Sequence, residues 1–256
     1  MKITIREKPK KDLFIALFST LKNCSTIVNI SFEPDKIHIQ GMDKSHICLY
    51  DIYIQQKWFS HYEVAKVTNV AFDSSVFHLI ISNKTDGYDI LIHTECEDNL
   101  HIDLIASENT KGEFNKHFKL PLCEYDYEEM VITDTDYEAE FSISSKKICE
   151  IISQMVLFGS DINIKCTEEK IDLITNGITG EMSVNIPIDD LTEYGIVEGE
   201  EIDLTYSLSY IHKMCLTNKL SNEIDFFISK QTPMKMKYSL GDESSLMFYI
   251  APKISD

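Results

Sequence analysis

Hydrophobic and polar residues alternate along eight short segments of the chain, and this period of two is typical of β-strands with one buried face. Four segments lie in each half of the chain: residues 35–41, 49–55, 88–94 and 99–106, then residues 162–167, 170–175, 201–207 and 224–229. The pattern predicts a chain in which strands outnumber helices.

A second pattern, with hydrophobic residues at positions i, i+3, i+4 and i+7, predicts helices. We expect two longer helices beginning near Lys11 and Lys146, and two shorter ones near Asp73 and Leu208. Strands and helices mixed in this way predict an α+β fold. The inward faces of the longer helices are Phe14, Leu17, Phe18 and Leu21, and Ile148, Ile151, Ile152 and Met155.

An internal repeat relates the two halves of the chain. The segment NISFEPDKIHI, which starts at Asn29, matches NIKCTEEKIDL, which starts at Asn163, so the offset is 134 residues (163 − 29). The same offset places His78 on His212. Two similar domains are therefore expected, one in each half.

A short acidic segment, residues 123–136, separates domains predicted at 1–122 and 137–256. Such a composition suits an exposed, extended connector. Its centre, residues 130–132, is apolar, and we expect these residues to dock onto another surface. The acidic residues of the connector are Glu124, Asp126, Glu128, Glu129, Asp134 and Asp136.

The net charge of the chain is −18, which taken alone argues against a nucleic-acid partner. A ligand, however, experiences the local field of one face rather than the net charge. No apolar run approaches ~18 residues, and the first residues lack the apolar centre of a signal peptide, so we expect an intracellular protein without a membrane span. The seven cysteines are odd in number and contain no Cys-x-x-Cys, which favours reduced thiols.

Catalytic and metal-binding motifs are absent from the sequence. It contains no phosphate loop, no His-Glu-x-x-His and no Gly-x-Ser-x-Gly. His46 and Cys48 lie two residues apart on a predicted strand, but a zinc site needs about two more ligands. We expect no metal and no cofactor. The many Asp and Glu residues leave a carboxylate-dependent hydrolase as a remote alternative.

Three stretches resemble the proliferating cell nuclear antigen family, the eukaryotic DNA sliding clamps. The first is IHIQGMDKSHICLYDIYI at residues 37–54, which is similar to a strand–loop–strand of the family. SQMVLFGSDINIKC at 153–166 and MFYIAPKISD at 247–256 are similar to the central helix with its following strand and to the C-terminal tail. Departures from the eukaryotic pattern suit a divergent protist or a large DNA virus. The resemblance thus implies a nuclear protein or one at a cytoplasmic replication site.

The resemblance implies two sliding-clamp domains per chain and a head-to-tail homotrimer that encircles duplex DNA. Helices line the hole and sheets form the outer wall. Polymerase, clamp loader and other proteins with PIP-box-type peptides are the implied partners, and no catalytic residue is implied. A subunit of a heteromeric, checkpoint-like clamp is the alternative. The implied subunit edges are residues 112–120 and 177–186.

Basic residues on the helices are the implied contacts with DNA. Lys11 and Lys22 are eleven residues apart, about three turns, so we expect them to share a helix face. Lys22 matches a DNA-facing lysine of the family. The third helix carries Glu150, Ser153 and Leu157 where the family has basic groups, so the hole should be less positive than usual. The complete set is Lys10, Lys11, Lys22, His78, Lys146, His212 and Lys213.

A hydrophobic patch is the implied docking surface for partner peptides. The family receives there a glutamine, an aliphatic anchor and two aromatic residues on one 3₁₀ turn. The connector of this chain is two residues longer than expected and lacks the family's usual Leu-Gly-Ile-Pro run. The implied patch is Met42, Ile47, Leu49, Met130, Ile132, Pro233, Tyr249, Ile250, Ala251 and Pro252.

Overall fold

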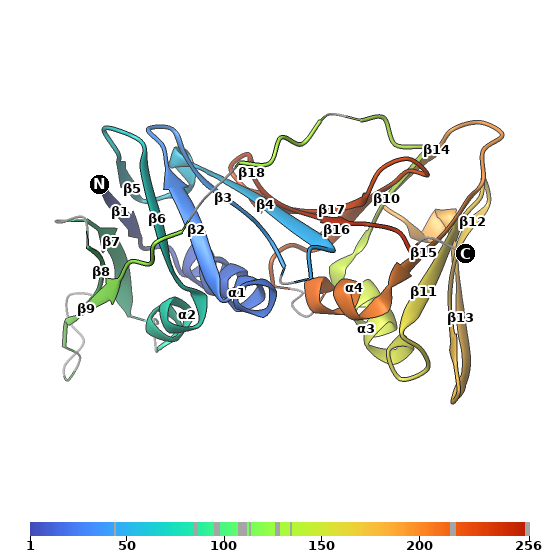
Figure 1. Cartoon of the computed structure of the whole chain (residues 1–256), viewed down its shortest axis with the longest axis horizontal. Coiled ribbons are helices and arrows are strands. Elements are labelled where there is room, and N and C mark those ends of the chain that lie inside the picture. Colours follow the sequence, from blue (N-terminus) through green and yellow to red (C-terminus); the bar gives the residue numbers. More distant parts are fainter. Residues whose placement is uncertain are drawn as a thin grey trace. The chain divides into compact units, whose positions relative to one another are not determined.

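The same order of helices and strands occurs twice along the chain in the computed structural model (Figure 1). The structure describes residues 1–43, 45–83, 87–94, 98–106, 112, 114–125, 129–133, 135–215 and 219–253. Cys96, Asp126, Glu128, Asp134 and part of the predicted edge 112–120 lie outside these ranges.

The first half contains two helices and a series of short strands. Its elements are β1 (Lys2–Ile5), α1 (Lys8–Cys24), β2 (Ile27–Phe32), β3 (Lys36–Met42), β4 (Cys48–Gln55), the 3₁₀ turn η1 (Gln56–Trp58), β5 (His61–Glu63), β6 (Thr68–Asp73), α2 (Ser74–Ser82), β7 (Tyr88–His93), β8 (Asn99–Ala106) and β9 (Lys116–Pro121).

The second half repeats this order element by element. Its elements are β10 (Ala139–Ser144), α3 (Ser145–Met155), β11 (Asp161–Cys166), β12 (Lys170–Gly177), β13 (Gly180–Pro187), η2 (Ile188–Asp190), β14 (Glu193–Ile196), β15 (Ile202–Ser207), α4 (Leu208–Cys215), β16 (Glu223–Ile228), β17 (Met234–Gly241) and β18 (Ser244–Ile250).

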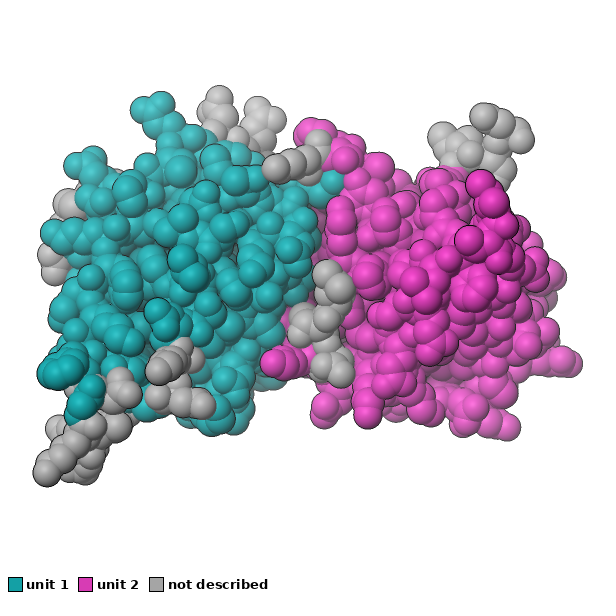
Figure 2. Space-filling model, turned by 90° about the horizontal axis from the view of Figure 1, so that it is seen from below, with its two compact units in different colours: residues 1–44, 51–130, 240–245 teal, residues 45–50, 131–239, 246–256 magenta. Residues whose placement is uncertain are grey.

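The chain folds into two compact units, coloured separately in Figure 2. They divide between Met130 and Val131, within the predicted connector. Two short segments belong to the unit of the other half. Unit 1 comprises Met1–Lys44, Asp51–Met130 and Leu240–Ser245, and unit 2 comprises Ser45–Tyr50, Val131–Ser239 and Leu246–Asp256.

The strand orders of the two halves are also equivalent. The first half contains the orders β5-β1-β7-β8-β9 and β4-β3-β2-β6, and the second half contains β14-β10-β16-β17-β18 and β13-β12-β11-β15. The hairpin β12–β13 illustrates the antiparallel register, which runs from Lys170 opposite Pro187 to Gly177 opposite Gly180. The predicted α+β fold and all eight predicted strands are confirmed.

Each unit packs a pair of helices next to one another, α1 with α2 and α3 with α4 (Figure 1). The predicted inward face of α1 is confirmed, because Phe14, Leu17, Phe18 and Leu21 are all buried. Phe18 and Phe77 bring the aromatic rings of α1 and α2 within 4.5 Å, measured between centroids. On α3, Ile148, Ile152 and Met155 are buried, whereas Ile151 is only half-buried.

Helix ends follow local chemistry that can be read from the sequence. Helix α1 begins at Lys8, earlier than expected, because Pro9 fits the first helical turn, where no backbone N–H is needed. Asp73 caps α2 by accepting hydrogen bonds from the backbone N–H groups of Ser75 and Val76, at 2.8 and 2.9 Å.

Some predictions need correction. His46 is not on a strand but in the turn before β4, at φ 55°, and it is exposed, whereas Cys48 begins the strand and is fully buried. The two side chains therefore do not share a strand face. The predicted edge segments become strands only from Lys116 and from Gly180 onward. The six cysteines within the described ranges are free thiols, as expected for those six.

Candidate nucleic-acid interface and partner-binding surface

Lys22 on α1 and His78 on α2 meet at the helix pair of unit 1. The Lys22 Nζ lies 3.2 Å from the His78 Nδ1, and both side chains are half-buried. Burial, and secondarily the ammonium of Lys22, lowers the pKa of His78 from its ordinary value of 6.5. The pair thus concentrates one positive charge, with a neutral imidazole as its neighbour near pH 7.

The neighbouring lysines of α1 do not join this pair. Lys11 is only 5% exposed, and its Nζ donates a hydrogen bond of 2.6 Å to the carbonyl of Tyr88. The Lys10 Nζ lies 2.8 Å from Asp242 and 5.6 Å from the ring centroid of Trp58. The helix period places Lys11 and Lys22 on one face of α1, but strand β7 covers Lys11. Lys11 is therefore corrected from a surface contact to a buried lysine.

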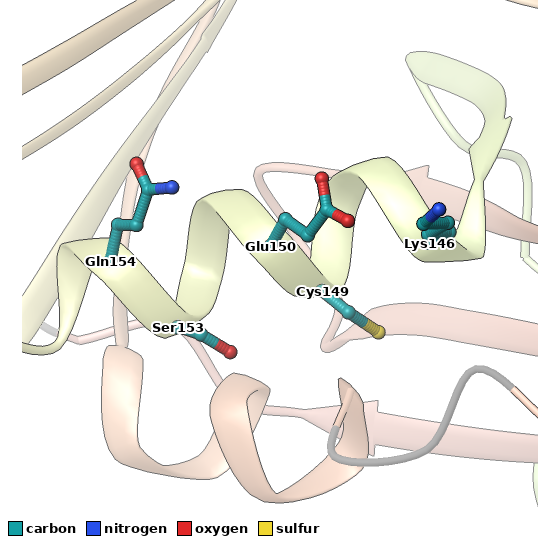
Figure 3. A pocket seen from close by; sticks show the side chains of 5 residues that line it. All are labelled: Lys146, Cys149, Glu150, Ser153 and Gln154. Atoms are coloured by element: carbon teal, nitrogen blue, oxygen red, sulfur yellow. The ribbon is translucent and has the colours of Figure 1, made fainter.

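In unit 2, a row of side chains on α3 lines an open hollow of about 350 Å³ (Figure 3). Cys149 and Ser153 point to one side of the helix, and Glu150 and Gln154 point to the other. The lining carries one positive group, Lys146, and one negative group, Glu150, so its charges balance. The expectation that the hole of a ring is less positive than usual stays a prediction.

Helix α4 contributes two more of the predicted DNA contacts in unit 2, His212 and Lys213. Lys213 is exposed, and its Nζ lies 5.1 Å from the ring centroid of Tyr210. His212 is half-buried. On α3, Lys146 and Lys147 are exposed as well. Each unit therefore presents basic groups on its helix pair.

In unit 1, the predicted peptide patch includes Met130, whose backbone is held by two hydrogen bonds. Gln40 Nε2 donates a hydrogen bond of 3.0 Å to the carbonyl of Met130, and Gln40 Oε1 accepts one of 2.7 Å from the Met130 N–H. Gln40 is buried, and Met42 and Met130 are half-buried. The apolar centre of the connector thus docks at Met130 alone, through the backbone, whereas the expected docking of Val131 is wrong because that side chain is 88% exposed.

In unit 2, other members of the patch lie near the chain's last strand. The Ala251 N–H donates to the carbonyl of Ile47 at 3.4 Å. Ile47 and Ile132 are each 37% exposed, and Val131 is 88% exposed. These values leave apolar surface on two different segments of unit 2.

Successive side chains of β18 point to opposite faces of the sheet, and this alternation separates patch residues from core residues. Ile250 is fully buried together with Phe248, while Tyr249 is half-buried. Ile250 is therefore corrected from patch to core, because it lies on the inward side of its strand. The remaining members differ in exposure: Pro233 and Ala251 are exposed, and Leu49 and Pro252 are half-buried.

Sequence reasoning missed three buried polar residues, His38, Gln40 and Asp51, as elements of the site. The His38 Nε2 lies 2.7 Å from the Asp51 Oδ1. No sequence signal marked them, because His38 and Gln40 alternate with Ile37 and Ile39 as polar residues do on a solvent-facing side of a strand. Only the fold shows that this polar face is buried.

Among the described residues, no group of three or more His, Cys, Asp or Glu is arranged to hold a metal ion. Within the same part of the chain, no helix combines the length and apolar character needed to cross a membrane.

Family models match both halves of the chain. The model of the proliferating cell nuclear antigen N-terminal domain matches residues 9–129, and that of the C-terminal domain matches residues 131–253. The proliferating cell nuclear antigen of Chaetomium thermophilum is 25% identical over 233 residues, covering 89% of each chain. Proliferating cell nuclear antigen 2 of Plasmodium falciparum is 25% identical over 254 residues, covering 95% of this chain and 96% of the relative.

Solved structures share the fold. The PCNA2–PCNA3 complex from Sulfolobus tokodaii contains a chain that superposes with a TM-score of 0.87 at 22% identity, covering 99% of both chains. PCNA from Thermococcus kodakaraensis also gives a TM-score of 0.87, at 20% identity, covering 98% of this chain and 99% of the other. At these identities the likeness establishes the fold.

The first prediction concerns the Lys22–His78 pair. Replacing Lys22→Ala should raise the pKa of His78, because the smaller of its two causes is removed, yet leave it below 6.5, because burial remains. NMR titration of the His78 ring measures this change. Lys147→Ala, an exposed lysine on α3, is the matched control and should leave the titration unchanged. The same midpoint in wild type and Lys22→Ala would show that the pair does not exist in solution.

Proposed function

The chain belongs to the proliferating cell nuclear antigen family, and from this we propose that three copies close into a ring that encircles duplex DNA and tethers polymerases to it. The same ring would serve the clamp loader and other replication and repair proteins. The observation that carries the ring is a duplicated fold in which two different sheet edges, the outer sides of β9 and β13, have no strand paired to them among the described residues. We propose a binding role rather than a catalytic one, in keeping with the family.

The sheet edges other than β9 and β13 are either covered or short, which supports a ring closed through β9 and β13. The edge of β6 receives a hydrogen bond from the Cys123 N–H to the Ala71 carbonyl, and the edge of β15 receives one from Lys253 to Thr205, both at 2.7 Å. The acceptors are 134 residues apart (205 − 71), the offset of the repeat. Strands β5 and β14 are only three and four residues long. Short strands and covered edges are poor templates for pairing.

The repeat indicates how the remaining edges, β9 and β13, would pair. Their equivalents are β18 and β4. In unit 1 the Gln55 N–H, at the end of β4, donates to the Ser244 Oγ at 3.0 Å. In unit 2 the Ala251 N–H, just after β18, donates to the Ile47 carbonyl. We propose that β9 of one copy meets β13 of the next in the same way, head to tail.

The surroundings of these edges are suited to burial. Beside β9, Phe114 is 77% exposed and Leu79 on α2 is 67% exposed. Beside β13, Ile178 and Leu157 are also largely exposed. Exposed apolar groups of this size next to a free edge favour a protein interface. The β9 edge carries Lys116 and Lys119, whereas β13 carries Glu181, so the two edges are complementary in charge.

A heteromeric ring is the second candidate, and one observation favours it. The solved structure from Sulfolobus tokodaii is a complex of two different clamp proteins, PCNA2 and PCNA3. The mass of the purified protein in solution discriminates between the candidates. A homotrimer has three times the mass of the 29.5 kDa chain, whereas a chain that needs a different partner stays smaller.

For DNA we propose weak, sequence-independent contacts from both helix pairs. Lys22 and His78 would provide them in unit 1, and Lys146, His212 and Lys213 in unit 2. Lys10 contributes less in this proposal, because Asp242 offsets its charge. A ring holds DNA by topology, so its contacts can remain weak and allow sliding, while the net charge of −18 discourages adsorption elsewhere. Such a role places the protein in the nucleus, or at a cytoplasmic replication site if the source is viral.

For partners we propose that a peptide with an aliphatic anchor and two aromatic residues binds the apolar patch. The patch consists of Met42, Ile47, Leu49, Met130, Ile132, Pro233, Tyr249, Ala251 and Pro252. Exposed carboxylates of the connector, such as Glu124, would attract basic residues that flank the peptide. An apolar surface of this kind is compatible with affinities in the micromolar range, about 8 kcal/mol.

The second prediction tests the edge. Val184→Pro should yield monomers, because proline cannot donate a backbone hydrogen bond and distorts an edge strand. Sedimentation equilibrium gives the mass, and circular dichroism verifies folding. Glu193→Pro, at the start of the outer strand β14, is the control and should remain trimeric. A folded Val184→Pro protein of trimer mass would mean that β13 is not the subunit edge.

The third prediction tests the patch. Ile132→Glu places a carboxylate where an apolar peptide anchor would bind, and its desolvation should weaken binding at least about tenfold. Titration of a fluorescent glutamine–aliphatic–aromatic–aromatic peptide measures the affinity. Val131→Glu is the matched control, because this neighbour is 88% exposed and should bind as wild type does. Equal affinities for wild type and Ile132→Glu would remove Ile132 from the patch.

A further inference from the structure

Unit 1 buries a set of polar side chains that the proposed contacts do not use. His38 and Gln40 on β3 and Asp51 on β4 are each less than 5% exposed. A buried carboxylate is costly unless it is paired and hydrogen-bonded. The other face of β3 is apolar, with Ile37 and Ile39 in the core. Burying this polar face costs free energy that an apolar face would not cost, so we expect the polar face to have a function.

These side chains lead from the sheet to two consecutive residues of the connector. Asp51 Oδ1 lies 2.7 Å from the His38 Nε2 and 3.5 Å from the Gln40 Nε2. Gln40 in turn makes its two hydrogen bonds to the backbone of Met130. The other ring nitrogen of His38, Nδ1, lies 3.8 Å from the Glu129 Oε1. The buried Asp51 carboxylate thus supports two neighbouring contacts with the connector, one at Glu129 through His38 and one at Met130 through Gln40.

The His38 ring is held so that each nitrogen has a fixed direction. It stacks on Tyr53 with centroids 4.4 Å apart and an interplanar angle of 4°. On β3, the Lys36 Nζ lies 5.3 Å from the Tyr53 ring centroid. Across the sheet, the β2 neighbour of His38 is Ser31, which carries no charge. The groups that face His38 are thus the carboxylates of Asp51 and Glu129, the Tyr53 ring and, behind it, the Lys36 ammonium.

The two carboxylates make this arrangement depend on protonation. A protonated ring can donate from Nε2 to Asp51 and present a second N–H to Glu129. A neutral ring has one N–H only, so either Asp51 loses its donor or a lone pair faces the Glu129 carboxylate. Attraction between the ring and the Glu129 carboxylate is therefore a property of the protonated ring.

We propose that His38 and Gln40 are positioning residues that fix the connector at Glu129–Met130 for partner binding. The part that concerns partner binding rests on the proposed peptide patch. Glu129 is 65% exposed, so water competes with the ring and the charge effect is modest. Gln40 supplies the uncharged part of the attachment through its two hydrogen bonds to Met130.

The fourth prediction compares Glu129→Gln with wild type. Both are titrated with a fluorescent glutamine–aliphatic–aromatic–aromatic peptide that has uncharged flanks. Wild type should bind about twofold to fivefold more tightly than Glu129→Gln does, because the variant loses the charged contact with the His38 ring. Glu124→Gln, an exposed carboxylate of the same connector, is the matched control and should follow wild type. A Glu129→Gln protein that binds the peptide as tightly as wild type would overturn the proposal.

Hydrogen exchange at the Met130 amide tests the attachment without any peptide. Protection of this amide should fall in Glu129→Gln at pH 6, stay unchanged in Glu124→Gln, and fall most in Gln40→Ala. If neither wild type nor any variant binds the peptide, the proposed peptide patch is wrong. The exchange data still test the attachment of the connector at Glu129–Met130. Unchanged protection in Glu129→Gln would refute the attachment. Reduced protection with unchanged peptide affinity would refute the positioning role.

Discussion

An uncovered sheet edge is the constraint on which the proposed assembly depends. The outer strand of a sheet presents a row of unpaired backbone N–H and C=O groups, which can form hydrogen bonds with another strand or with a covering segment. In this chain, segments at Cys123 and Lys253 cover two edges, and hydrogen bonds flank β4 and β18. The strands equivalent to β4 and β18 in the other half, β13 and β9, are left at the ends of their sheets. A ring of identical copies would pair these two strands with each other and leave only the short strands β5 and β14 and the covered strands β6 and β15 at the sheet ends described here.

Weak local charge fits the same account. The proposed DNA contacts include a lysine beside a largely neutral histidine, and on α3 the hollow contains one lysine and one glutamate. These groups would hold a phosphate backbone loosely, which suits sliding, because the closed ring rather than the contacts would prevent dissociation. Partner proteins would then supply the stronger interactions through the apolar patch.

Local patterns in the sequence predicted the elements well. Alternation located eight of the eighteen strands that the structure describes, the helix period located the buried face of α1, and the repeat anticipated the matching order of both halves. Long-range contacts were not predictable in this way. The helix period places Lys11 on one face with Lys22, but only the fold shows that β7 covers Lys11. The positive φ of His46 depends on its turn, and the bond between Gln40 and Met130 joins residues 90 positions apart. Ile250, in contrast, could have been assigned to the core from strand alternation alone.

Retention on closed and open DNA tests the central claim of an encircling ring most directly. The protein is incubated with linear duplex DNA that carries biotin at both ends, streptavidin is added to block the ends, and free protein is removed at high salt. Topological binding predicts that the protein stays on the blocked DNA and is released once a restriction enzyme cuts it. The Val184→Pro monomer should never be retained. Release at the same rate from cut and uncut DNA would contradict the ring.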